Sequence, residues 1–133
     1  MQEFGLYIPK YDFATSTQYD GKLSNIREKQ KELIKDKSAV SLLENWIVDG
    51  SKAKVRKMTN DNIKQILRTF NTECENAIDK VKFNNIESMK KIIEKSFKSL
   101  NKLNQTVRVS IREEFLNLKI EELYLAHEYQ MKK

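Results

Sequence analysis

One apolar stripe constrains the fold of this 133-residue chain more than any other feature of its sequence. From Thr59, a residue type that can cap a helix, apolar side chains recur at every third or fourth position. The stripe comprises Ile63, Ile66, Leu67, Phe70, Cys74, Ala77, Ile78 and Val81. This spacing predicts a long helix that begins at Thr59 and buries one face against the rest of the domain.

Similar patterns predict one helix before this stripe and one after it. Thr15 to Thr17 can cap the earlier helix, and Asn84 or Asn85 can cap the later one. The earlier stripe is formed by Tyr19, Leu23, Ile26, Gln30 and Leu33. The later stripe is formed by Ile86, Met89, Ile93, Phe97, Leu100 and Leu103, and a turn is expected within residues 101–106.

The last predicted helix differs from the others because it carries two apolar stripes. Ser110 and Glu113 fit a capping box at its start. One stripe contains Ile111, Phe115, Leu118, Leu125 and Tyr129, and the other contains Leu116, Ile120 and Leu123. Two stripes require two partners, of which one is the domain's own core and the other is an N-terminal element, a second protomer or another domain. Leu116, Ile120 and Leu123 are therefore candidate oligomer or interdomain contacts.

The domain organisation follows from the length and from the end of the last helix. The chain has the size of one domain. No Gly, Pro or cap follows the last stripe before Lys133. We expect residues 1–133 to form a single domain that is a fragment of a longer multidomain protein, with the last helix continuing beyond residue 133.

Residues 39–57 contain two conflicting signals. Ser41 and Glu44 can form a capping box for a short helix. Trp46-Ile47-Val48 followed by Asp49-Gly50 is instead typical of a β-hairpin with a type I′ turn. We favour the hairpin, with Asp49-Gly50 at its tip and residues 51–57 as its second strand.

The first residues and the low glycine content complete the predicted fold. Residues 4–13 are aromatic and interrupted by Pro9, which favours an extended arm lying across the helices. Three Gly and one Pro are too few for a sandwich or barrel with many tight turns. The expected fold class is α+β and predominantly helical, with about four helices, one short β-hairpin and an extended N-terminal arm.

The second strand of the predicted hairpin is the strongest candidate for a binding site. Lys52, Lys54 and Arg56 alternate with Ala and Val, so a strand places them on one face, and Lys57 follows. Such a face suits phosphate or an acidic partner, with Trp46 available for stacking. A solvated edge strand explains the same lysines without a partner.

A second basic region has an explanation within the fold. Residues 80–102 hold seven Lys and two Glu, whereas residues 111–131 hold five Glu. If the last two helices pack antiparallel, part of this lysine charge is answered by the acidic helix, in pairs worth a few tenths of a kcal/mol each.

Composition argues against membrane insertion and against several kinds of chemistry. No apolar run is long enough to cross a membrane, so we expect no direct membrane insertion by this segment. Cys74, the only cysteine, favours a reducing, cytoplasmic setting. His127 is the only histidine, and we expect it to be solvated or packed, whereas Cys74 lies in an apolar stripe and is expected in the core. Capping and solvation explain the adjacent pairs Glu113-Glu114 and Glu121-Glu122. We expect no catalytic residue, metal or cofactor.

Three segments resemble a known family. They are Trp46 to Lys64 (WIVDGSKAKVRKMTNDNIK), Gly5-Leu6-Tyr7 with residues 11–16, and residues 118–123 with 125–130. Together they resemble the bacterial and phage domain of unknown function 4041. In that family the domain typically follows a coiled coil, sometimes with a membrane anchor, and precedes a GIY-YIG-type nuclease domain. Gly5-Leu6-Tyr7 matches only the first half of the GIY-YIG signature, and the second half is absent.

The resemblance implies a function without catalysis in this segment. The leading prediction is a recognition and regulatory module of a phage-defence or mobile-element nuclease, which docks its own nuclease domain or another protein. The alternative is a module that binds DNA non-specifically through the basic hairpin and positions it for the nuclease. The second alternative is an oligomerisation domain that forms a homo-oligomer. This segment is expected to be cytoplasmic, and the resemblance implies that the parent protein is membrane-associated in some members.

Overall fold

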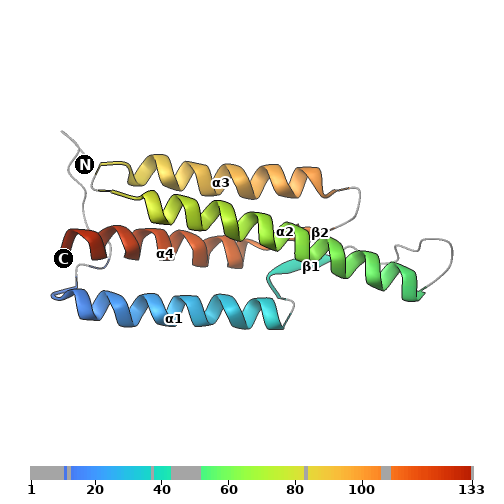
Figure 1. The fold of residues 1–133 in the computed structure, drawn as a ribbon, viewed down its shortest axis with the longest axis horizontal. Coiled ribbons are helices and arrows are strands. Elements are labelled where there is room, and N and C mark those ends of the chain that lie inside the picture. Colours follow the sequence, from blue (N-terminus) through green and yellow to red (C-terminus); the bar gives the residue numbers. More distant parts are fainter. Residues whose placement is uncertain are drawn as a thin grey trace.

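The computed structural model describes residues 11, 13–36, 38–42, 52–82, 84–105 and 109–132, with the backbone alone for residues 42, 52–59 and 132. Its elements are α1 (Ser16–Lys35), β1 (Val40–Leu42), α2 (Lys52–Lys80), α3 (Ile86–Leu103), β2 (Val109–Ile111) and α4 (Glu113–Lys132). The predicted fold class is confirmed, because these elements form a predominantly helical α+β domain (Figure 1).

Helix α4 lies between α1 on one side and the α2–α3 pair on the other (Figure 1). Neighbouring helices run antiparallel, α1 against α4 and α2 against α3. The first turns of α2 extend past the ends of α1, α3 and α4. None of the helices in the described ranges has an apolar stretch long enough for a membrane span.

The predicted start of α1 is confirmed. Thr15 is the N-cap and forms a capping box with Gln18. The Gln18 amide donates to Thr15 Oγ1 at 3.4 Å, and the Thr15 amide donates to Gln18 Oε1 at 3.2 Å. Two unpaired donors of the first turn are thereby satisfied.

Asn85 precedes α3 as predicted, but its side chain does not cap that helix. Its Nδ2 donates to the Lys80 carbonyl at 2.9 Å, and its Oδ1 accepts from the Lys82 amide. Asn85 therefore closes the connection between α2 and α3. The turn expected within residues 101–106 includes Asn104, which follows the last residue of α3.

The predicted hairpin is wrong in its second strand. Residues 52–57 belong to α2, which begins at Lys52 and not at Thr59. The physical reason is helix propensity, because residues 52–59 contain Lys, Ala, Arg and Met without Gly or Pro. The predicted tip at Asp49-Gly50 lies outside the described residues. Ser110 is not the cap of the last helix either, since it lies in β2 and α4 begins at Glu113.

The only sheet formed by the described residues joins two segments that are far apart in the chain. Strands β1 and β2 are antiparallel, with Val40 opposite Ile111 and Leu42 opposite Val109. Val40, Val109 and Ile111 are buried in the core. The ambiguous residues 40–42 are therefore a strand, and its partner is β2.

Two buried clusters meet at α4. The larger contains Phe70, Ile93 and Leu123 and lies between α4, the α2–α3 pair and the sheet. The smaller contains Tyr19, Leu23, Ile26 and Leu125 and lies between α1 and α4. The prediction that α4 has two partners is thus confirmed: the second partner is an N-terminal element, α1.

Candidate functional site

The basic segment that the sequence singled out lies at the N-terminal end of α2. Lys52, Lys54, Arg56 and Lys57 occupy its first turns, and Trp46 lies outside the described residues. A helix rotates about 100° per residue, so positions two apart do not share a face. The argument that placed these charges on one face of a strand therefore no longer applies.

The candidate oligomer contacts lie within the fold. Leu123 is fully buried in the larger cluster, and Leu116 and Ile120 pack against it half-buried. These residues contact the α2–α3 side of the same chain. Leu123 has no exposed surface to offer a second protomer, whereas the oligomeric state itself stays a prediction.

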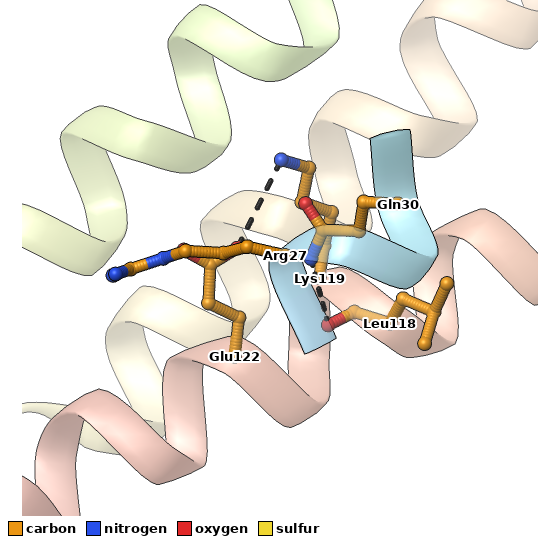
Figure 2. Close-up of polar contacts among 5 residues, drawn as sticks. All are labelled: Arg27, Gln30, Leu118, Lys119 and Glu122. Atoms are coloured by element: carbon orange, nitrogen blue, oxygen red, sulfur yellow. Dashed lines mark hydrogen bonds and ion pairs between the residues drawn. The ribbon is translucent and has the colours of Figure 1, made fainter. Parts of the chain in front are cut away.

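A buried polar cluster joins α1 to α4 (Figure 2). Glu122 is 6% exposed, and its Oε1 accepts a hydrogen bond from Gln30 Nε2 at 2.9 Å. Its Oε2 accepts from Arg27 Nε at 3.0 Å. Gln30 also donates to the Leu118 carbonyl at 3.3 Å, and Lys119 Nζ lies 3.9 Å from Glu122 Oε1. These contacts satisfy a buried carboxylate and fix how α1 is aligned against α4.

A second buried carboxylate attaches the start of the described chain to α4. Glu128 is 1% exposed, and its Oε1 accepts from the Tyr19 hydroxyl at 3.0 Å and from the Tyr11 amide at 3.1 Å. The Phe13 amide donates to the Tyr19 hydroxyl at 2.9 Å. Burial, together with the carboxylates of Glu121 and Glu128, raises the pKa of Tyr11. Tyr11 and Phe13 thus lie against the helices, as predicted for the end of the arm.

These clusters correct the interpretation of the acidic residues. Glu122 is not solvated, because it sits between two helices with three polar partners. His127 is buried, in agreement with packing. The sequence contains one indication of this cluster, which is Gln30. A polar residue in the apolar stripe of α1 needs a buried hydrogen-bond partner, and Glu122 is that partner.

Cys74 is an internal residue of α2. Its side chain is fully buried in the larger cluster, and burial raises the pKa of the thiol to about 12. The thiol is therefore protonated at neutral pH and acts as a small apolar side chain. In the described part of the chain, His, Cys, Asp and Glu form no group of three or more that could hold a metal ion.

The lysine-rich helix α3 is antiparallel to α4 as predicted, but the expected pairing of charges is wrong for its outer lysines. Lys91, Lys95, Lys98 and Lys102 are exposed, and none forms a salt bridge with a described residue. The buried acid Glu122 turns to α1 instead. The acidic residues of α4 therefore form no ion pair with these four lysines.

A groove of about 430 Å³ lies between the C-terminal end of α1 and the middle of α2. Its apolar lining is Ile34, Ile63 and Leu67, and Lys64 and Arg68 add two exposed positive charges. Asn71 Oδ1 is buried at this groove and has no hydrogen-bond partner among the described residues. The groove therefore combines an apolar floor with cationic edges.

The fold is a predominantly helical α+β domain in which the buried carboxylates of Glu122 and Glu128 join α4 to α1 and to the start of the described chain. The chain belongs to the SNIPE-associated domain family, whose model matches residues 16–133. This family is associated with GIY-YIG nucleases, in agreement with the class of protein that the sequence resembles, although the match carries another family name. No curated protein and no solved structure is significantly similar to the chain.

Proposed function

We propose that this chain is a non-catalytic accessory domain of a phage-defence or mobile-element nuclease, and that it docks the nuclease domain or a partner protein. The match to the SNIPE-associated domain family over residues 16–133 carries this proposal. Within the proposal, DNA cleavage belongs to the associated nuclease domain, and this chain positions or regulates it.

The groove between α1 and α2 supports docking and indicates the chemistry of the docked segment. Ile63 and Leu67 provide apolar surface, while Lys64 and Arg68 attract acidic side chains. The segment that fits is therefore apolar on one side and acidic on its edges.

The test is binding between this chain and a GIY-YIG-type nuclease domain of the kind with which the family is associated. We expect a Kd in the micromolar range by titration calorimetry, and a changed rate of DNA cleavage on addition of the chain. Charge reversal at the groove, Lys64→Glu with Arg68→Glu, should weaken binding at least tenfold.

The matched control is Lys29→Glu with Lys82→Glu, which makes the same charge change at exposed positions that do not line the groove. Equal weakening by both double variants would contradict docking in the groove. The absence of binding at about 100 μM would contradict docking of the nuclease domain altogether. DNA cleavage by this chain alone, with Mg²⁺ or Mn²⁺ supplied, would contradict the non-catalytic role.

A further inference from the structure

The four exposed lysines of α3 form one straight row. Lys91, Lys95, Lys98 and Lys102 are spaced by four, three and four residues. At about 100° per residue they lie within an arc of roughly 60°. At about 1.5 Å per residue the row is roughly 16 Å long. It is therefore a compact line of positive charge along the helix and not a scatter of surface lysines.

This row faces away from the core. The buried side of α3 contains Ile93, and Phe97 and Leu100 pack against the same cluster. Because each residue rotates the helix by about 100°, the four lysines lie on the opposite side of α3, about 180° from its buried side. Because the row projects outward, a large partner can reach all four ammonium groups at once.

Two acidic side chains lie beside the row, because Glu87 and Glu94 precede Lys91 and Lys98 by four residues. Glu87 and Glu94 are the acidic residues of α3, and neither forms a salt bridge with these lysines. On α2, the Glu73 carboxylate accepts a 2.6 Å hydrogen bond from the Ser96 hydroxyl. The described structure thus gives these lysines no ion-pair partner of their own.

A groove beside the row gives it a concave side. It has a volume of about 610 Å³ and is lined by Lys98 and Lys102 of the row, with Phe97, Asn101, Gln105, Val109 and Ser110. A hollow edged by one sign of charge concentrates counter-ions, because low-dielectric walls focus the field. The C-terminal half of the row is therefore the place where a polyanion would be held most closely.

We infer that this lysine row is a contact surface for the phosphate backbone of duplex DNA. Successive phosphates of one strand advance about 3.4 Å along the helix axis, so the row spans roughly five of them. Lysines act as point charges, and the row has no Arg or exposed aromatic residue for base recognition. Binding is therefore expected to be independent of sequence. This inference goes beyond the docking function, because α3 does not line the α1–α2 groove.

The same geometry argues against an anionic membrane as the partner. Ile92 and Leu103 are the exposed large apolar residues of α3, and they lie about 90° from the centre of the row. A helix that lies in a membrane surface needs a continuous apolar face, whereas the apolar face of α3 is used by the core.

The experiment measures binding of the 133-residue chain to a random duplex by fluorescence anisotropy, with salt varied from 50 to 200 mM. Four phosphate contacts predict a slope of log K against log salt of about −3.6, which is a loss of roughly 10²-fold in affinity over this range. The variant with Lys91, Lys95, Lys98 and Lys102 all changed to Gln should lose most of this binding and most of the slope. Gln keeps helix propensity, and circular dichroism checks the fold.

The control variant changes Lys29, Lys31, Lys35 and Lys82 to Gln, which are exposed positions on α1 and in the connection between α2 and α3, outside the row. It has the same net charge as the row variant and should bind duplex within about twofold of wild type. Equal loss in both variants, or no binding by wild type at 50 mM salt, would overturn the inference. Binding of polyglutamate or phosphatidylserine vesicles in preference to duplex would overturn it too.

The result can be separated from the docking function. Arg68→Glu should weaken binding of the nuclease domain and leave the salt slope for DNA nearly unchanged. The row variant should retain binding of the nuclease domain. A row variant that loses the nuclease domain but keeps full DNA affinity would contradict this assignment of the row.

Discussion

The side chain of Asn101 makes two hydrogen bonds with the backbone of Ile111. Its Nδ2 donates to the Ile111 carbonyl at 3.2 Å, and its Oδ1 accepts from the Ile111 amide at 2.6 Å. The amide group thus takes the place of a neighbouring strand at the edge of β2. It joins the C-terminal end of α3 to a sheet of only two short strands.

Asn101→Ala should lower the free energy of unfolding by about 1–3 kcal/mol, because it removes both partners of the Ile111 backbone. Urea denaturation measures the change, and hydrogen exchange should show faster exchange at the Ile111 amide. Asn117→Ala, at an exposed position of α4, should change stability by less than about 0.5 kcal/mol. Equal effects of the two variants would contradict the bridging role.

Glu122→Ala should destabilise the domain by about 3–5 kcal/mol, because it leaves the ammonium of Lys119 buried without its carboxylate partner. The control is Glu28→Ala, which breaks an exposed pair with Lys31 and should cost less than about 0.5 kcal/mol. Chemical denaturation of both variants provides the comparison. A small effect at Glu122 would mean that the interface between α1 and α4 can rearrange.

Thr15→Ala should reduce stability by about 1 kcal/mol through loss of the N-cap of α1. Thermal unfolding followed by circular dichroism detects the change. The control is Thr17→Ala, at the second residue of α1. It also removes a threonine hydroxyl, but this hydroxyl caps no helix, so the change should be neutral or slightly stabilising.

Stability should fall as the pH rises from about 9 to about 12, in part because of Cys74. The pKa of the thiol is about 12 in the folded chain and 9.0 as its ordinary value. Above pH 9 the unfolded chain therefore binds fewer protons, which favours unfolding by up to about 1.4 kcal/mol per pH unit. Subtracting the pH profile of Cys74→Ala isolates this contribution from those of Lys and Tyr. An unchanged difference between the two profiles would contradict the raised pKa.

Leu123→Glu should unfold the domain, because it places a charge in the larger cluster where Leu123 is fully buried. Ile92→Glu, at a side chain that is 45% exposed, should cost less than about 1 kcal/mol. Circular dichroism and analytical ultracentrifugation distinguish unfolding from dissociation. If the Leu123→Glu variant were folded and its particle mass in solution were lower than that of the wild type, Leu123 would again be a candidate oligomer contact.

Local patterns predicted the helices well because each carries its own periodic signal. The stripe from Ile63 to Val81 and the capping Thr15 correspond to observed features. The last helix does have two buried sides, but its residues are divided differently from the prediction, because Ile111 and Phe115 lie in the larger cluster with Leu123 while Leu125 lies in the smaller one. The hairpin failed because Asp49-Gly50 is a local signal, whereas the true partner of residues 40–42 is residues 109–111. Three-residue strands are too short to show a period, and their pairing across most of the chain leaves no trace in either segment.

The candidate surfaces were less predictable for a related reason. The spacing of Lys91, Lys95, Lys98 and Lys102 can be read from the sequence. Whether acidic residues of α4 form ion pairs with these lysines depends on the direction of their side chains, and the Glu122 side chain is hydrogen-bonded to Gln30 of α1. The α1–α2 groove likewise depends on where α1 lies relative to α2, which follows from the packing of both helices against α4.

The pairing of α1 with α4 has a consequence for how the chain is made. The apolar stripe of α1, formed by Tyr19, Leu23 and Ile26, packs against residues of α4 such as Leu125. During synthesis at about 5–20 residues per second, roughly 100 further residues must emerge before α4 exists. The apolar stripe of nascent α1 therefore stays without its partner helix for about 5–20 s. We expect α1 to be the first segment of this domain that ribosome-associated chaperones and proteases bind.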